Sequence, residues 1–106
     1  MVDVESFRKL ALSFPDAREA PHFEKTSFRF KKKIFATLAV KEKRVVLKLT
    51  LEDQSVFTAF DNSIFYPVPN KWGRQGWTTI ELKLVRQDVC IDAVGQAYGA
   101  VSGKGK

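Results

Sequence analysis

Three strand-like segments follow one another at residues 26–31, 34–40 and 44–50, and they restrict the possible folds more than any other feature. The first alternates phenylalanine with a basic residue, the second is rich in β-branched residues, and the third alternates aliphatic residues with Val46 and Lys48. A period of two is typical of a strand with one buried face. The short polar turns between the segments predict a three-stranded antiparallel meander. The residues of the third segment expected to face the core are Val45, Leu47 and Leu49.

Helical patterns flank this meander. Apolar residues at helical spacing predict a first helix that is capped by Asp3 and ends before Pro15. Thr50, followed three positions later by an acidic residue, resembles a capping box and predicts a second helix. A third helix is expected from about residue 86 to residue 101, and residues 16–24 are expected to form a polar connection.

Two more strands complete the expected order. They lie at residues 64–68 and 77–82, and Pro67 and Pro69 confine the first of them to an edge. The resulting order, α-βββ-α-β-β-α, predicts an α+β fold. We expect a mostly antiparallel sheet of about five strands with helices packed on it.

The size of the chain limits the domain organisation. Its 106 residues fit one domain, and 44 % hydrophobic residues supply one core. We expect residues 1–101 to form the domain and residues 102–106 to be a disordered tail. The start of the chain does not resemble a signal peptide, and the apolar run at residues 34–40 is far too short to cross a bilayer. We therefore expect a cytoplasmic protein without a membrane partner.

The formal net charge of +6 is unevenly distributed along the chain. Residues 21–50 contain nine bases and two acids, whereas residues 51–70 contain three acids and no base. Such asymmetry favours a polyanionic partner. A solvated basic surface that only keeps the protein soluble explains the same charge equally well.

Both tryptophans of the chain lie in one heptapeptide, Lys71–Trp77, and bracket Gly73 and Gly76. Glycine permits a positive φ and lets another backbone or a ligand approach closely. Tryptophan offers a flat apolar face and one N–H donor. The pattern predicts a shaped loop that enters a strand at Trp77.

With these motifs, the chain resembles the MmcQ/YjbR family from about residue 7 to residue 98. The segments that carry the resemblance are Pro21-His22-Phe23, Ser27-Phe28-Arg29, Lys33 to Leu38, Val46 to Leu49, Phe65 to Pro69 and Trp72 to Trp77. The resemblance implies a compact α+β fold with a double-wing arrangement in a small bacterial protein. It also implies DNA binding, a role inferred for the family largely from shape and charge, so DNA is favoured over RNA. One departure is the basic segment at residues 83–87, which predicts weak capping of the last helix.

Basic residues of the predicted hairpins are candidates for contacts to phosphates. Consecutive turns of a meander lie at opposite ends of the sheet, so the two basic turns need not form one surface, although Arg29 and Lys48 could join them. No predicted helix resembles a recognition helix, and we expect little sequence-specific reading. The candidate nucleic-acid-binding residues are Arg29, Lys31, Lys32, Lys33, Lys41, Lys43, Arg44, Lys48, Lys71, Arg74 and, as a stacking platform, Trp72.

The alternative function is a protein- or small-ligand-binding module. An aromatic-proline groove around Phe65 to Trp72 could hold a peptide or a metabolite, with Tyr66, Trp72 and Gln75 as its contacts. A rigid edge segment packed on the sheet would show the same pattern.

Catalytic chemistry is not expected. The chain has one histidine, His22, and one cysteine, Cys90, which cannot build a closed zinc site. His22 is expected to bond to backbone or pack on an aromatic ring, and Cys90 to be a buried apolar residue. The sequence therefore predicts no enzyme, no metal and no cofactor.

Overall fold

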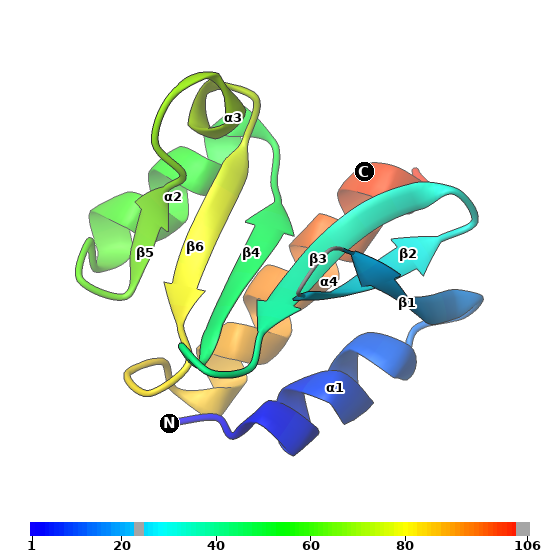
Figure 1. The fold of residues 1–106 in the computed structure, drawn as a ribbon. Coiled ribbons are helices and arrows are strands. Elements are labelled where there is room, and N and C mark those ends of the chain that lie inside the picture. The colour runs from blue at the N-terminus through cyan, green and yellow to red at the C-terminus, as the bar shows by residue number, and fades with distance from the viewer. Residues whose placement is uncertain (23–24, 104–106) are drawn as a thin grey trace.

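The protein is a six-stranded antiparallel sheet with helices packed on it, as seen in a computed structural model that describes residues 1–22 and 25–103, without the side chain of His22. The strand order is β1-β2-β3-β4-β6-β5 (Figure 1). The strands are β1 (Ala17–His22), β2 (Lys25–Phe30), β3 (Lys33–Ala39), β4 (Arg44–Lys48), β5 (Phe65–Pro67) and β6 (Trp77–Glu81). The helices are α1 (Val4–Leu12), α2 (Leu51–Phe60), α3 (Lys71–Arg74) and α4 (Gln87–Ser102). The predicted α+β class is confirmed, with one strand more than the expected five.

The extra strand is β1, and it corrects the prediction of a polar connection at residues 16–24. Ala17–His22 pair antiparallel with β2 at the edge of the sheet. The segment contains Pro21 and no apolar alternation, so its sequence gives no strand signal. An edge strand tolerates proline because only one side of its backbone must be paired. The guanidinium of Arg8 in α1 also holds this strand, at 2.8 Å from the carboxylate of Glu19.

One face of the sheet is covered by helices. Helix α4 packs across β2, β3 and β4, α2 packs on β5, and α1 lies against β1 (Figure 1). The rings of Phe7 in α1 and Phe28 in β2 meet edge to face at 5.6 Å, and both are fully buried. The residues of β4 expected to face the core, with Leu49 after it, are buried as predicted: Val45, Leu47 and Leu49.

The helix ends follow the predicted capping. The Asp3 carboxylate accepts a hydrogen bond from the backbone N–H of Ser6, and the Thr50 hydroxyl accepts one from the N–H of Asp53. Arg86 at the start of α4 makes no capping bond through its side chain, as expected from the basic segment before it. Helix α4 continues to Ser102 with Gly103 as its C-cap, and residues 104–106 of the predicted tail lie outside the described residues.

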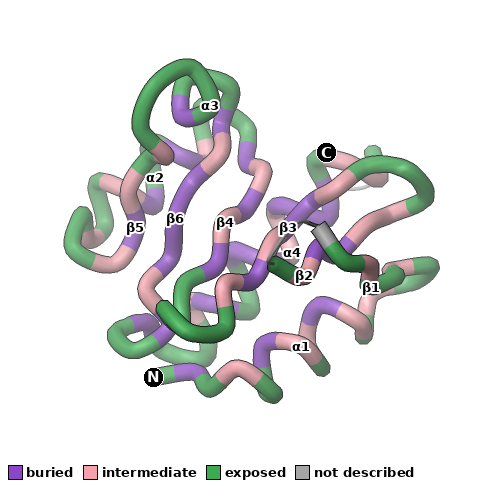
Figure 2. Tube along the Cα trace, viewed as in Figure 1, coloured by how far each residue is buried: buried purple, intermediate pink, exposed green. Residues whose placement is uncertain are grey.

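The opposite face of the sheet is the open face. Among the described residues only α3 lies beside it, at the end where β4 stops and β6 begins (Figure 1). We call that end the upper end and the opposite one, at the turn between β3 and β4, the lower end. Burial alternates along β4 between the two faces (Figure 2). Of the two faces, the open face is therefore the one that the described helices leave less covered.

Candidate functional site

A row of small side chains crosses the open face from β2 to β5. The strand register places Ser27 opposite Thr37, Thr37 opposite Val46, and Val46 opposite Thr79. Thr79 in turn lies opposite Tyr66 in the edge strand β5. Side chains at directly opposite positions share one face of a sheet. Four of these five side chains are small or β-branched. The row therefore forms a shallow depression across the sheet, which we call the floor.

A β-bulge in β3 adds Ile34 to this face. The pairing of β3 with β2 shifts by one residue and leaves Phe35 as the extra residue. An extra residue resets the alternation of a strand. Phe35 and Ala36 are consequently both fully buried, and Ile34 and Thr37 line the same hollow although they are three positions apart.

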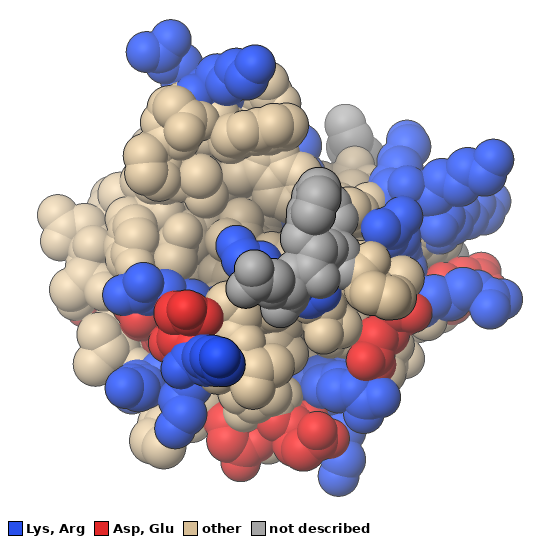
Figure 3. Space-filling view, viewed as in Figure 1, with Lys and Arg blue, Asp and Glu red and all other residues tan. Residues whose placement is uncertain are grey.

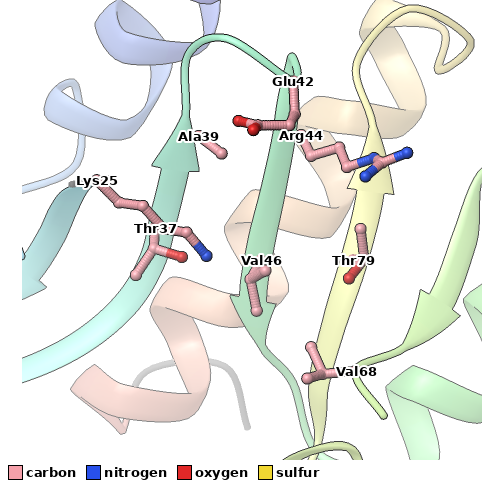
Figure 4. A pocket seen from close by; sticks show the side chains of 8 residues that line it. All are labelled: Lys25, Thr37, Ala39, Glu42, Arg44, Val46, Val68 and Thr79. Carbon is pink, nitrogen blue, oxygen red and sulfur yellow. The ribbon is translucent and has the colours of Figure 1, made fainter. Parts of the chain in front are cut away.

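Two adjoining hollows on this floor together form what we call the open-face groove. They share Lys25, Thr37, Val46 and Val68. The upper hollow has a volume of about 350 Å³ and is also lined by Ile34, Trp72 and Trp77. The lower hollow has a volume of about 320 Å³ and is also lined by Ala39, Glu42, Arg44 and Thr79 (Figure 4). Both volumes are within the range of small-molecule sites in proteins.

Lys25 is the cation of this groove that the sequence analysis did not single out. Its side chain extends from β2 across β3 and ends near Thr37 and Val46 (Figure 4). No described acid pairs with it. The available signal was its position two residues before Ser27, because residues two apart in a strand share a face. The distribution of charge along the chain does not show which residues share a face of a strand.

An ion pair and a hydrogen bond connect three side chains at the lower end of the groove. The guanidinium Nε of Arg44 lies 2.8 Å from the Oε2 atom of Glu81, and the hydroxyl of Tyr66 donates a hydrogen bond to the same carboxylate. Burial, and then the bond to Glu81, raises the pKa of the Tyr66 hydroxyl, and the bond to Glu81 also raises the pKa of Arg44. Arg44 is therefore already paired, although the sequence suggested it as a phosphate contact.

The upper end is built by the Trp-containing heptapeptide, which forms the single helical turn α3 and not a loop. Two side chains from other elements hold this turn. The amide of Gln54 in α2, itself buried, donates to the carbonyl of Gly73 at 2.9 Å. The ammonium of Lys48 donates to the carbonyl of Gln75 at 2.5 Å. Lys48 is therefore a support for α3 and does not join the two basic turns.

The two glycines of the heptapeptide are required by close backbone contacts. Gly76 has φ +104°, and a Cβ atom added there would lie 1.9 Å from the carbonyl oxygen of Leu49. A Cβ atom at Gly73 would lie 2.0 Å from the carbonyl oxygen of Val68. No L side chain fits either position without movement of the backbone. The prediction of a close backbone approach at both glycines is confirmed.

Trp72 is the exposed aromatic residue at this end. Its side chain is 50 % exposed and lines the upper hollow, and its backbone N–H is capped by the side chain of Asn70. Trp77 is half-buried and lines the same hollow from β6. The ammonium of Lys71 lies 6.0 Å from the centre of the Trp72 ring.

Two groups of cations without an acidic partner lie at the upper end. Lys31, Lys32 and Lys33 lie at the turn between β2 and β3, and Lys71 and Arg74 belong to α3. Basic side chains stand out at the top of the molecule, over α3, and at its right (Figure 3). We call these the hairpin lysines and the α3 cations. All five are exposed, and none pairs with an acid among the described residues. The α3 cations flank Trp72 in the chain at the upper end of the groove, whereas the hairpin lysines line a separate hollow with Phe30 and with Val101 of α4.

The other candidate residues lie elsewhere. Lys41 and Lys43 are exposed at the lower end, so the two basic turns do not form one surface. The guanidinium of Arg29 donates to the Ser27 hydroxyl at 3.0 Å. Phe65, at the start of the aromatic-proline segment, is fully buried in the core, and Gln75 is exposed beyond α3. Of the three contacts named for that segment, Trp72 lines the groove.

Of the two candidate reactive residues, the structure describes the side chain of Cys90 alone. Cys90 is fully buried, and burial raises the pKa of its thiol to about 11. The side chain of His22, and Phe23 beside it, lie outside the described residues. Within the described residues there is no cluster of three or more histidine, cysteine, aspartate or glutamate side chains able to hold a metal ion.

The fold and the groove define a small α+β domain with one helix-covered and one open sheet face. Residues 12–100 match the sequence model of the YjbR family, and the chain belongs to that family. It is similar in structure to protein DR2400 of Deinococcus radiodurans, which contains a DUF419 domain, with a TM-score of 0.83. The two are 20 % identical, and the match covers 100 % of this chain and 83 % of that chain, which supports the fold.

No curated protein sequence matches this chain. In the described part of the chain, no helix is both long and apolar enough to span a membrane.

Proposed function

We propose that this protein is a non-enzymatic nucleic-acid-binding protein of the cytoplasm that contacts mainly phosphates and reads little sequence. The observation that carries the proposal is the pair of cationic groups, the hairpin lysines and the α3 cations, at the upper end of the sheet (Figure 3). Family membership adds a DNA-binding expectation, so DNA is the favoured nucleic acid.

The electrostatics support this choice of surface. Three consecutive lysines, Lys31–Lys33, repel one another, and no described acid offsets their charge. A polyanion relieves that repulsion and releases its own counterions, which is the main source of sequence-independent affinity. By contrast, Arg44 is paired with Glu81 and Lys48 is bonded to a backbone carbonyl.

The test is a fluorescence-anisotropy titration of labelled DNA at several salt concentrations. We expect the logarithm of the binding constant to fall linearly with the logarithm of the salt concentration, with a slope of about −3 or steeper. Changing Lys31, Lys32 and Lys33 together to Gln should make the slope shallower by about 2 to 3. The matched control, Lys41→Gln with Lys43→Gln at the lower end, should change it by less than about 1. No binding even at low salt would overturn the proposal.

A second candidate is a protein- or small-ligand-binding module that uses the open-face groove. The groove volume of about 350 Å³ favours it, because small-molecule sites begin near this size. The two functions differ in their dependence on salt and on the hairpin lysines. Binding that is lost with Trp72→Ala but is insensitive to salt and to the Lys31–Lys33 substitutions would favour this second function.

A further inference from the structure

We propose that the open-face groove binds one unstacked nucleotide, with its base in the upper hollow and its phosphate at Lys25. The groove would then make the protein prefer single strands to duplexes. This inference rests on the proposed function, and it assigns a ligand class to the groove, which the charge argument alone does not.

The upper hollow has the chemistry of a base site. Ile34, Val46 and Val68 supply apolar surface, and Trp72 and Trp77 supply aromatic rings. A nucleobase is flat and has apolar faces, so it gains contact area against such walls. Trp72, with half of its surface exposed, still has ring area to cover. A site with this lining favours a planar heterocycle over a purely charged ligand.

The proposed phosphate site lies beside the Lys25 ammonium group and the Thr37 hydroxyl. Its ammonium group ends over the floor near Thr37, whose hydroxyl faces the same hollow (Figure 4). Neither side chain has a hydrogen bond or ion pair to another described residue. An ammonium and a hydroxyl are both donors to phosphate oxygens. The groove thus places one free cation next to an apolar hollow. A nucleotide matches this arrangement, because it joins a charged phosphate to a flat base with apolar faces.

The charges at the lower end of the groove determine which way round the nucleotide lies. Glu42 lines the lower hollow, and Glu81 adds a second carboxylate whose charge Arg44 already compensates. A phosphate placed beside Arg44, away from Lys25, would approach Glu42 without gaining a free cation. The phosphate is therefore expected at Lys25 and not at Arg44.

The position of the groove predicts the preference for single strands. In a duplex the bases are stacked and paired, so they cannot enter a hollow on the face of a sheet without being unstacked. The exposed hairpin lysines and α3 cations remain accessible to duplex phosphates. A duplex is expected to use only those cations, whereas a single strand uses them and the groove together.

The test compares three probes under identical salt: a single-stranded DNA of about 12 nucleotides, the duplex of the same length, and a free nucleoside monophosphate. The wild-type protein should bind the single strand about tenfold more tightly than the duplex. Trp72→Ala and, separately, Lys25→Gln should each weaken single-strand binding about tenfold and duplex binding less than about twofold. Trp72→Phe should keep most of the single-strand affinity, because a ring remains.

Two controls separate this inference from the proposed function. Changing Lys31, Lys32 and Lys33 to Gln should weaken both DNA forms equally, and Lys83→Gln, at an exposed position beyond β6, should leave both nearly unchanged. Equal affinity for single strand and duplex, or equal losses with Trp72→Ala, would overturn the inference while the proposed function survives. Binding of the free nucleotide alone, lost with Lys25→Gln, would support the nucleotide site and overturn the DNA function. Circular dichroism of each variant shows that it is folded.

Discussion

The two faces of the sheet are formed by the same strands, but one face packs in the core and the other lines the groove. Val45 and Leu47 of β4 are fully buried under α4, whereas Val46 between them lines the open-face groove. In β6, Ile80 is buried in the core and the neighbouring Thr79 belongs to the groove floor. One step along a strand thus separates a residue that packs in the core from a residue that lines the groove. Substitutions on the two faces should therefore have separable effects.

The largest expected difference between the faces is in stability. Phe28→Ala removes a fully buried ring that meets Phe7 and should lower the free energy of unfolding by about 3–5 kcal/mol. Val46→Ala on the open face should cost less than about 1.5 kcal/mol, because its side chain is only half-buried. Urea denaturation measures both values. Equal losses would mean that the open face contributes to the fold as much as the core does.

The next effect tests whether α3 depends on its glycines. Gly76→Ala places a Cβ atom against the Leu49 carbonyl at a positive φ and should cost more than about 2 kcal/mol. The control is Gly95→Ala in α4, where a Cβ atom would meet nothing within 4 Å. That change should stabilise the protein by about 0.5–1 kcal/mol. A tolerated Gly76→Ala would show that the upper end of the groove is less constrained than we describe.

A smaller loss of stability is expected for a buried residue of α2 that supports α3. Gln54→Ala removes a buried amide that donates to the Gly73 carbonyl and should cost about 1–3 kcal/mol. It should also weaken single-strand binding, because α3 carries Trp72. Ser55→Ala, on the exposed side of the same helix, should change stability by less than about 0.5 kcal/mol. If Gln54→Ala leaves binding intact, α3 keeps its position without this support.

The smallest effect is a pH dependence on the open face. The pKa of Tyr66 is raised in the folded protein, so the folded state holds this proton more tightly than the unfolded state does. Its contribution to stability is complete below the usual tyrosine pKa of about 10 and is lost as the pH rises through the folded value. Urea midpoints from about pH 9 to 11 should therefore fall more steeply for the wild type than for Tyr66→Phe. Parallel curves would contradict the predicted shift.

The sequence predicted the elements that local patterns specify. The alternation around Val45, the cap at Thr50 and the start of β6 at Trp77 all depend on residues close together in the chain, and all are confirmed. Strand β1 was missed because it contains Pro21 and has no apolar alternation. It forms because β2 supplies backbone partners and α1 packs beside it. These contacts are made to other parts of the chain, so the sequence of β1 alone does not predict them.

The candidate site shows the same division. Trp72 and the hairpin lysines were identified from residue type, whereas Lys25 was missed, because its importance comes from the face it shares with Thr37 and Val46. Lys48 was suggested as a phosphate contact and lies instead on the Gln75 carbonyl. Residue type identifies possible binding groups, but bonding partners decide which of them are free.

The sequence by itself determined the family, the α+β class and the side chains of β4 that face the core, because these depend on motifs and on short-range periodicity. Only the tertiary structure decided which cations lie together. Strand β6 enters between β4 and β5, so Arg44 meets Glu81, 37 positions away, and the α3 turn lies at the same end of the sheet as Lys31–Lys33. The physical reason is that strand order and register, which are set by packing of the whole core, bring distant segments to one end of the sheet.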